Sequence, residues 1–167
     1  MGTAAIFVPV DDFTLQRLRQ APGDAEQILY PDEDEDGLSR DAFDVDKAWH
    51  GLHYLLNGTS EGGEPPLAWA IYGDEQLNDA DIGMGGAGVL TPPQVREVAA
   101  ALAALPPTEL RRRYDPQRMA ALKIYPDVIW VRDGQHALDY VMEHFEPLAK
   151  FYADTAARGD CLFIYMS

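Results

Sequence analysis

The sequence contains little cysteine and few basic residues. Cys161 is the only cysteine among 167 residues, so no disulfide can form within the chain. Its apolar neighbours, "CLFIYM", favour a buried, inert thiol over a nucleophile. Lys and Arg number 13 against 28 Asp and Glu, which gives a formal net charge of −15. Such a surface repels nucleic acid and anionic membranes; it either attracts a basic protein partner or serves only as a solvated surface.

Signals for membrane insertion, secretion and common catalytic chemistry are also missing. No segment reaches the roughly 18 consecutive apolar residues of a membrane span, and the N-terminus lacks the basic region of a signal peptide, so we expect a cytoplasmic protein. G-x-S-x-G, H-E-x-x-H and Walker motifs are absent, and no nucleophile stands out. No repeat or linker divides the chain. We predict one domain, 1–167, without an assigned cofactor or catalytic residue; the oligomeric state is left open.

The local patterns predict strands at both ends of the chain and helices between them. Thr3–Val10 and Cys161–Met166 are short runs of apolar and β-branched residues, which is typical of strands, and Asp127–Gly134 has the pattern of another strand. Because strands and helices do not alternate, we predict an α+β fold, mostly helical, with a small sheet that includes the N- and C-terminal strands. Helices are predicted at 11–21, 24–30, 46–57, 91–105, 109–114, 117–123 and 135–158, with a kink at Pro147 in the last.

The run "DIGMGGAG" contains a literal G-x-G-x-x-G in Gly83, Gly85 and Gly88. A dinucleotide fingerprint needs such glycines between a strand and a helix, so that the helix N-terminus faces the pyrophosphate. Here the preceding residues are polar and turn-like, and "VLTPP" separates the run from the next helix, for which Thr91 is a natural N-cap. The context therefore favours a structural loop; the wall of a pocket for another ligand is the alternative.

The predicted helix 46–57 carries a polar stripe of Asp46, His50, His53 and Asn57. Two histidines at i, i+3 with an acid one turn earlier can bind a transition metal or act as a base with an orienting acid. Zinc would require a third protein ligand, which the sequence does not indicate, so we assign no metal. A polar face bonded to nearby loops, or a contact for a ligand or partner, are the other possibilities. The opposite arc is apolar and is expected to face the core: Ala48, Trp49, Leu52, Leu55 and Leu56.

An acidic segment, 32–46, leads into this helix. Residues 32–37, "DEDEDG", match the first half of an EF-hand loop, but Phe43 stands where a bidentate glutamate would complete the calcium site. A solvated acidic loop fits this pattern better than a calcium site. The segment can also contact a partner or the chain's own basic cluster: Arg111, Arg112, Arg113, Arg118 and Lys123.

Several longer stretches resemble a known family. "DVDKAWHGLHYLLNGTS", "LTPPQVREVAAAL", "RRRYDPQRM", "IYP" and "FEPLAKFYADTAARGDCLFIYMS" occur in that order, and together they resemble the YfbM-like family of small bacterial proteins, a domain-of-unknown-function group. The resemblance implies a single α+β domain in a bacterial cytoplasm and brings no established catalytic residues. Where that family commonly has Pro-Ala-Arg after its glycines, this chain has Gly86-Ala87-Gly88, and the missing arginine weakens a phosphate-binding interpretation further.

Two functional hypotheses follow. The first is a non-catalytic binding or regulatory module, for example an immunity-like protein that neutralises a toxin, whose acidic surface meets a basic protein partner. The second is a small-ligand binder or enzyme, with a pocket between the polar stripe of Asp46, His50, His53 and Asn57 and the loop from Gly83 to Gly88.

Overall fold

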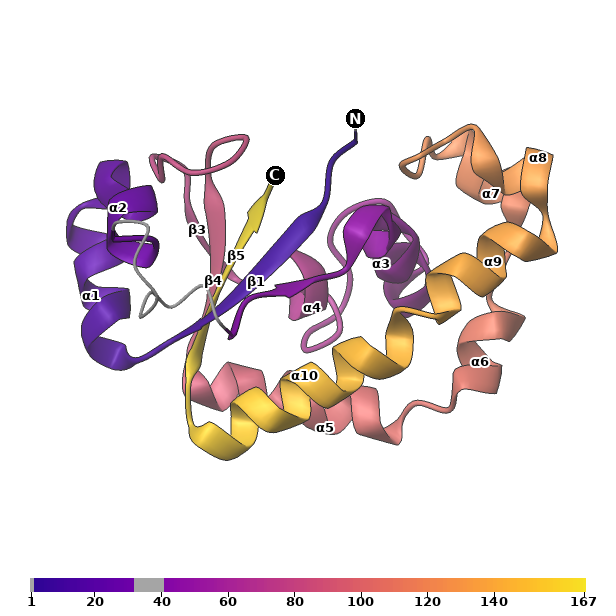
Figure 1. Cartoon of the computed structure of the whole chain (residues 1–167). Coiled ribbons are helices and arrows are strands. Elements are labelled where there is room, and N and C mark those ends of the chain that lie inside the picture. The colour runs from indigo at the N-terminus through magenta and orange to yellow at the C-terminus, as the bar shows by residue number, and fades with distance from the viewer. Residues whose placement is uncertain (1, 32–40) are drawn as a thin grey trace.

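The computed structural model describes residues 2–31 and 41–167 and contains one five-stranded antiparallel sheet (Figure 1). The sheet order is β2-β1-β5-β4-β3, so the two terminal strands lie side by side at its centre. This arrangement confirms the predicted α+β class and the sheet that joins the chain ends. The strands are β1 (Ala5–Val10), β2 (Phe43–Asp44), β3 (Glu75–Leu77), β4 (Ala87–Leu90) and β5 (Cys161–Met166).

Strand β1 contains a proline that the register accommodates. Ala4 and Ser167 exchange two backbone hydrogen bonds, so even-numbered residues of β1 bond to β5. Pro9 is odd-numbered, and its nitrogen faces the β2 side, where β2 pairs only with Ile6 and Phe7. The missing N–H of Pro9 therefore removes no hydrogen bond between the central strands.

Helices cover both faces of the sheet, and each face has its own apolar cluster (Figure 1). On one face, α1 (Asp12–Gln20), the 3₁₀ turn η1 (Pro22–Asp24) and α2 (Ala25–Leu29) pack on Val8, Val89 and Phe163. On the other face, helices pack on Phe7, Leu90 and Leu162. The elements on that side are η3 (Asp46–Ala48), α3 (Trp49–Asn57), α4 (Trp69–Tyr72), α5 (Pro92–Ala104), α6 (Pro107–Arg112), α7 (Pro116–Ala121), α8 (Ile129–Asp133), α9 (Gln135–Met142) and α10 (Phe145–Arg158).

Helix α5 begins as the sequence predicts. Thr91 is its N-cap, Pro92 occupies the first helical position, and Gln94 completes a capping box with Thr91. Its buried face, Val95, Val98 and Leu102, follows the predicted helical spacing. α5 packs against α10 along the base of the molecule in Figure 1.

Two predictions for the C-terminal third are wrong. Asp127–Gly134 is not a strand, because Ile129–Asp133 forms α8, which buries Trp130 completely and lets its Nε1 donate to the Ile124 carbonyl. The predicted helix 135–158 is divided into α9 and α10 at Glu143 and His144. Pro147 lies in the first turn of α10, where its missing N–H leaves no helical hydrogen bond unmade.

Among the described residues, no helix is both long enough and apolar enough to cross a membrane. Cys161 is fully buried, as its apolar neighbours predict, and burial raises the pKa of its thiol to about 12.

Candidate functional site

The polar stripe does not form as a unit, because Asp46 lies outside the helix. α3 begins at Trp49, and Asp46 occupies the preceding 3₁₀ turn with a left-handed φ of 51°. Its backbone N–H donates to the Asp44 carboxylate at 2.6 Å, and its own carboxylate accepts from the Tyr140 hydroxyl of α9 at 2.6 Å. The predicted helix start at Asp46 is therefore wrong, and the acid is directed to α9 instead of following the two histidines along one helix face.

His50 and His53 point at the loop that follows α3. His50 Nε2 lies 2.9 Å from the Ser60 carbonyl oxygen, and His53 Nε2 lies 3.0 Å from the Gly62 carbonyl oxygen. Because a carbonyl can only accept, both Nε2 atoms carry the proton and donate it. His50 Nδ1 accepts from the Tyr125 backbone N–H at 2.8 Å, so both of its ring nitrogens are engaged.

Asn57 completes this network at the end of α3. Its Nδ2 donates to the carbonyls of Leu67 at 3.1 Å and His53 at 3.2 Å, and lies 3.4 Å from His53 Nδ1. The structure thus brings His50, His53 and Asn57 together around loop 59–63, in the arrangement expected of histidines that bond to nearby loops.

An aromatic cluster surrounds the two imidazoles. Trp49 stacks on His50 at a centroid distance of 4.8 Å and on Tyr125 at 5.6 Å, and Tyr72 meets the His53 ring edge-on at 4.8 Å. Trp49 Nε1 donates to the Thr3 carbonyl, and the Tyr125 hydroxyl accepts from the Thr3 N–H. These contacts hold the start of the chain against α3.

Burial sets the charge of both histidines. It lowers the pKa of His53 to about 4, against a weaker opposing effect of the Gly62 carbonyl. It also lowers the pKa of His50, which the Ser60 carbonyl and the Glu61 carboxylate oppose. Both imidazoles are therefore neutral at pH 7.

The apolar arc of α3 faces the core as predicted, with Leu52 and Leu55 fully buried and Leu56 nearly so, while Trp49 is half-buried. His53, which the sequence places on the polar side, is also fully buried. The loop that returns over α3 covers it, and a helical periodicity alone does not indicate such a cover.

The glycine run connects β3 to β4 and leads into no helix. The N–H groups of Met84, Gly85 and Gly86 donate to the carbonyls of Met166, Ile82 and Ala80. A phosphate cradle needs such groups free to face an anion. Gly83, Gly85 and Gly86 instead supply positive φ values of 55°, 87° and 77°, which agrees with the prediction of a structural loop.

Gly88 lies inside β4, where the chain approaches α4 closely. A Cβ atom there would overlap the Tyr72 carbonyl oxygen, and a Cβ at Gly83 would overlap the Met166 carbonyl oxygen. Both positions require glycine because another backbone passes directly over them.

A pocket of about 210 Å³ adjoins this loop, below the roughly 300–1,000 Å³ of most small-ligand sites. Its lining includes no residue of the polar stripe. Tyr72 lines the pocket and also contacts His53, so it stands between the glycine loop and the histidines. The lining residues are Ile71, Tyr72, Gln76, Asn78, Gly85, Gly86, Ala87, Gly88, Ile164, Tyr165 and Met166.

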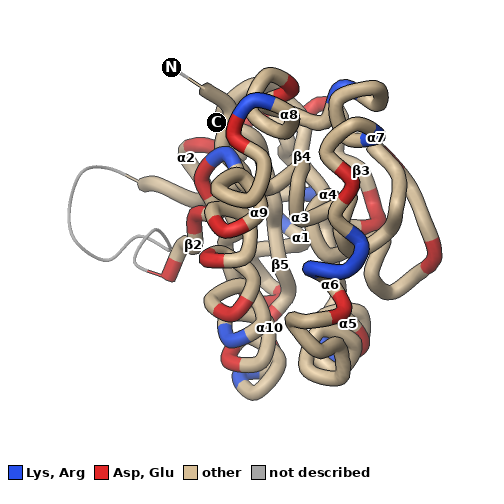
Figure 2. Tube along the Cα trace, turned by 90° about the vertical axis from the view of Figure 1, so that its right-hand side faces the viewer, with Lys and Arg blue, Asp and Glu red and all other residues tan. Residues whose placement is uncertain are grey.

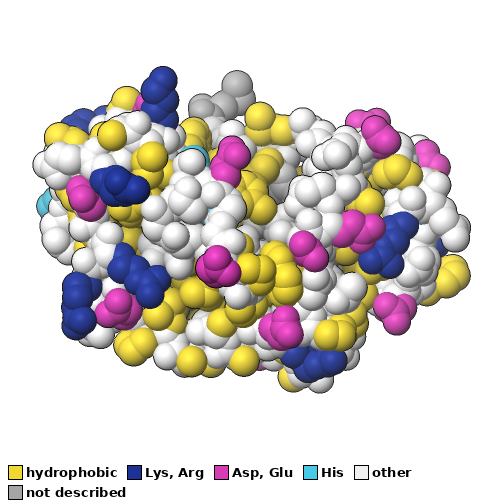
Figure 3. Space-filling model, turned by 180° about the vertical axis from the view of Figure 1, so that it is seen from behind, with side chains coloured by type: hydrophobic (Ala, Val, Ile, Leu, Met, Phe, Trp, Pro, Cys, Tyr) yellow, Lys and Arg dark blue, Asp and Glu magenta, His cyan; other side chains and the backbone are white. Residues whose placement is uncertain are grey.

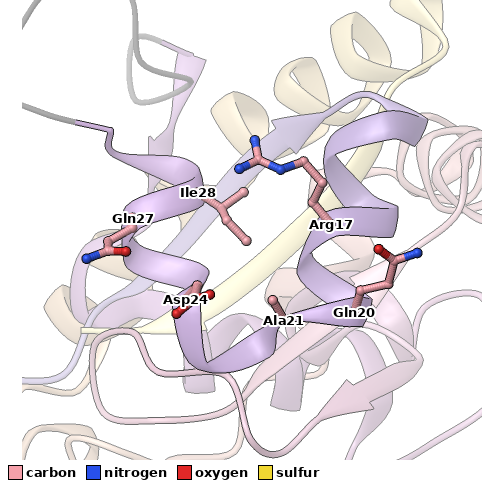
Figure 4. A pocket seen from close by; sticks show the side chains of 6 residues that line it. All are labelled: Arg17, Gln20, Ala21, Asp24, Gln27 and Ile28. Atoms are coloured by element: carbon pink, nitrogen blue, oxygen red, sulfur yellow. The ribbon is translucent and has the colours of Figure 1, made fainter.

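A larger depression of about 400 Å³ lies between α1 and α2 (Figure 4). The side chains of Arg17 and Ile28 reach across it from opposite helices, with Ala21 and Asp24 at the connecting turn. Its polar side chains are exposed. Within residues 2–31 and 41–167, no three His, Cys, Asp or Glu side chains are placed to hold a metal ion.

The basic cluster pairs with its own surroundings. Arg111 bonds to Asp139 at 2.8 Å, Arg112 to Glu109 at 3.2 Å, and Arg113 donates to the carbonyls of Leu55 and Leu56 at the end of α3. The calcium-like run 32–37 lies outside the described residues. The sequence alone did not reveal the contacts of Arg111 and Arg113, because they join segments far apart in the chain.

The predicted acidic segment 32–46 contributes Asp41, Asp44 and Asp46 to what we define as the acidic edge, at the β2 end of the sheet; Glu26 of α2, which lies outside that segment, is its fourth member, and all four residues are exposed. Burial is the main reason that the pKa values of Tyr140 and Tyr165 are raised; Asp46 and Asp44 add to the shift of Tyr140, and the bond to Tyr30, Glu26 and Asp44 add to that of Tyr165. The tube in Figure 2 marks acidic residues beside β2 and along α9, and basic residues on α6. A count of charge in short windows finds the acidic stretch 24–46, but not where its residues lie in the fold.

Comparisons with known proteins agree on one family. The family described as "Domain of unknown function (DUF1877)" matches residues 1–165. "Protein YfbM" of Escherichia coli strain K12 is 30% identical over 169 residues, which cover 96% of this chain and 95% of that protein. A crystal structure of the Escherichia coli YfbM, described there as a protein of unknown function, superposes with a TM-score of 0.77 at 21% identity, covering 98% of this chain and 99% of the other.

Proposed function

This chain belongs to the DUF1877 family, and because that family's description names no activity, we propose its function from the molecule's own surface. The protein is a non-catalytic binding module that uses the acidic edge of its sheet to hold a cationic protein partner. An immunity-like or regulatory role is one form of this activity. We propose a cytoplasmic setting, since a single unpaired cysteine suits a reducing compartment.

The observation that carries this proposal is the concentration of charge. Residues 24–46 contain ten carboxylates and one arginine, so this short stretch accounts for nine of the fifteen net negative charges. An acidic surface that serves only solubility is best distributed over the molecule. On the rear face, Figure 3 shows single charges of both signs scattered among apolar and uncharged groups. The uneven distribution favours a surface directed at a partner.

The chemistry of the acidic edge suits arginine. Carboxylates accept the paired N–H groups of a guanidinium, and aromatic rings offer it a face for stacking. Tyr140 bonds to Asp46 at 2.6 Å, so a phenol ring lies beside a carboxylate of this edge. We expect the partner to present arginines there.

The groups that first suggested catalysis have structural partners. The ring nitrogens of His50 and the Nε2 of His53 are hydrogen-bonded, and the amides of Met84, Gly85 and Gly86 serve the loop itself. The alternative of a small-ligand binder rests on the pocket of about 210 Å³ beside the glycine loop, which is small for that role. These features support binding through the surface over binding in a cavity.

The direct test is a binding titration with two matched variants. One neutralises the acidic edge: Glu26→Gln, Asp41→Asn, Asp44→Asn and Asp46→Asn. The control neutralises four exposed carboxylates elsewhere: Asp79→Asn, Asp81→Asn, Glu97→Gln and Asp127→Asn. The probe is a twelve-residue peptide of alternating arginine and alanine, measured by calorimetry at 50 and 300 mM NaCl. Asn keeps the hydrogen-bond acceptors of Asp44 and Asp46 and tolerates the positive φ at 46.

We expect the acidic-edge variant to bind at least about fourfold more weakly than the control, since the four exposed ion pairs contribute roughly 0.2–1 kcal/mol each. Binding by the unmodified protein should weaken at 300 mM NaCl, because salt screens exposed charges. Equal losses in the two variants would mean that only total charge matters. Binding that is insensitive to salt would also contradict the proposal.

A further inference from the structure

Two histidines of α3 tie three separate segments together. His50 Nε2 donates to Ser60 and His53 Nε2 to Gly62, which fixes loop 59–63 on α3. His50 Nδ1 accepts from the Tyr125 N–H, which fixes segment 123–126 on the other side of the same ring. We call this arrangement the histidine clamp. In Figure 1, α3, the N-terminal segment and the stretch before α8 lie at the same end of the molecule.

The clamp works only with neutral imidazoles. A neutral ring with its proton on Nε2 donates there and accepts at Nδ1, which is the pattern that the Ser60 carbonyl and the Tyr125 N–H require. A protonated ring carries hydrogen on both nitrogens. His50 Nδ1–H would then point at the Tyr125 N–H, and His53 Nδ1–H at the Asn57 amide, 3.4 Å away.

We propose that the histidine clamp is an acid-sensitive latch: protonation of His50 and His53 releases loop 59–63 and segment 123–126 from α3. Mild acid turns an attractive contact into a repulsive one at Tyr125, and two adjacent imidazolium ions repel each other across one helical turn. This device is independent of the binding activity proposed above.

The surroundings of the clamp offer little compensation for added positive charge. The Glu61 carboxylate of the loop opposes the effect of burial on His50 and so favours protonation of that ring. The same carboxylate adds to the effect of burial in raising the pKa of Tyr72. His50, on the same helix, opposes a positive charge on His53 and so lowers the pKa of His53 further. Tyr72 of α4 donates to the same Ser60 carbonyl, and Lys47 lies against Gly2 near the Tyr125 hydroxyl. Burial lowers the pKa of both histidines, in line with a latch that is closed at neutral pH.

Opening of the latch would also loosen the N-terminal segment, because Tyr125 and Trp49 both bind Thr3. Tyr125 accepts the Thr3 N–H at 2.8 Å and stacks on Trp49, whose Nε1 donates to the Thr3 carbonyl at 2.8 Å. When segment 123–126 moves, Thr3 loses one of these two ties. The face of Trp49, Tyr72 and Tyr125 then becomes accessible, so the latch controls exposure of an aromatic surface.

Hydrogen exchange with mass spectrometry between pH 7.5 and 4.5 tests the latch, after correction for the intrinsic pH dependence of exchange. His50→Gln and His53→Gln are the test variants, because a glutamine amide donates and accepts without titrating. His136→Gln is the control, at an exposed histidine outside the clamp. We expect the protection of peptides covering 59–63 and 123–126 to fall as pH drops below about 6.5, by up to about tenfold per pH unit for each histidine.

The remaining peptides should lose less protection than these two segments over this range, both glutamine variants should show a reduced pH response, and His136→Gln should behave like the unmodified protein. Uniform loss of protection across the chain would overturn the latch, and so would an unchanged response in both variants. If a variant fails to fold, ¹H–¹⁵N spectra of the imidazoles decide: protons on Nε2 at pH 7.5 support the proposal, and protons on Nδ1 contradict it.

Discussion

At the scale of single residues, glycine serves two different purposes between Gly83 and Gly88. Gly85 and Gly86 supply backbone angles for a turn, whereas Gly88 leaves room for the carbonyl of Tyr72 to pass over β4. The spacing of these glycines matches a dinucleotide fingerprint, yet each glycine has a local structural reason, either a backbone angle or a close backbone contact. The motif alone does not separate these reasons from ligand binding, because both require small residues.

We predict that Gly88→Ala destabilises the protein by at least about 3 kcal/mol, since its methyl group would meet backbone that cannot move independently. Gly23→Ala is the control, because nothing lies within 4 Å of a Cβ there; its effect should stay within about 0.5 kcal/mol. Urea denaturation measures both values. Similar stabilities for the two variants would refute the close approach of α4 to β4.

Because burial lowers the pKa of His53, the free energy of unfolding of the whole protein depends on pH. The folded pKa of His53, about 4, lies below the ordinary value of 6.5, so the unfolded chain binds a proton first as pH falls. The stabilisation is complete above pH 6.5 and is lost between there and pH 4. We predict that His53 alone lowers the free energy of unfolding by about 2 kcal/mol between pH 7.5 and pH 5.

Urea denaturation at the two pH values, with His53→Gln alongside, checks this figure. The variant should lose about 2 kcal/mol less than the unmodified protein over the same interval. An identical pH dependence in the two proteins would show that His53 is not held neutral by burial.

At the scale of elements, α3 is stabilised at its C-terminus by a residue far away in sequence. Arg113 donates to the carbonyls of Leu55 and Leu56 at 3.0 and 3.1 Å, where the helix leaves acceptors without intrahelical partners. A guanidinium there also complements the helix dipole. The basic cluster that the sequence marks as a possible partner for the acidic loop thus includes a helix cap.

We predict that Arg113→Ala lowers the free energy of unfolding by about 1–2 kcal/mol, because two carbonyls lose a charged donor. The neighbouring Arg112→Ala removes an exposed ion pair to Glu109, for which we expect at most about 0.5 kcal/mol. Thermal or urea denaturation compares the two. A larger loss for Arg112→Ala would contradict the capping role.

Elements that carry their own local signals were predictable. Thr91 and Pro92 mark the start of α5, and the apolar terminal runs form the central strands. α8 was not predictable as a helix from "DVIWVRD", because its β-branched residues favour a strand locally and the burial of Trp130 decides otherwise. β3 and β4 were missed because one is three residues long and the other contains Gly88.

At the scale of the whole molecule, charge was predictable but its location was not. Composition gives the net charge of −15, while the positions of Glu26, Asp41, Asp44 and Asp46 depend on where the fold places α2, β2 and η3. The polar stripe was predicted as one group of residues, but the fold separates its members. Its histidines fold into an internal network with loop 59–63, and Asp46 joins the acidic edge. Long-range packing, which periodicity does not report, decides both outcomes.

The most direct measurement of the central claim is an NMR titration of the ¹⁵N-labelled, full-length protein with the arginine–alanine peptide at 50 mM NaCl. The acidic edge predicts the largest chemical-shift changes for residues 24–46 and for Tyr140, and predicts that 300 mM NaCl diminishes them. The largest changes at the α1–α2 depression or at the glycine loop, or small changes spread over every carboxylate, would contradict it.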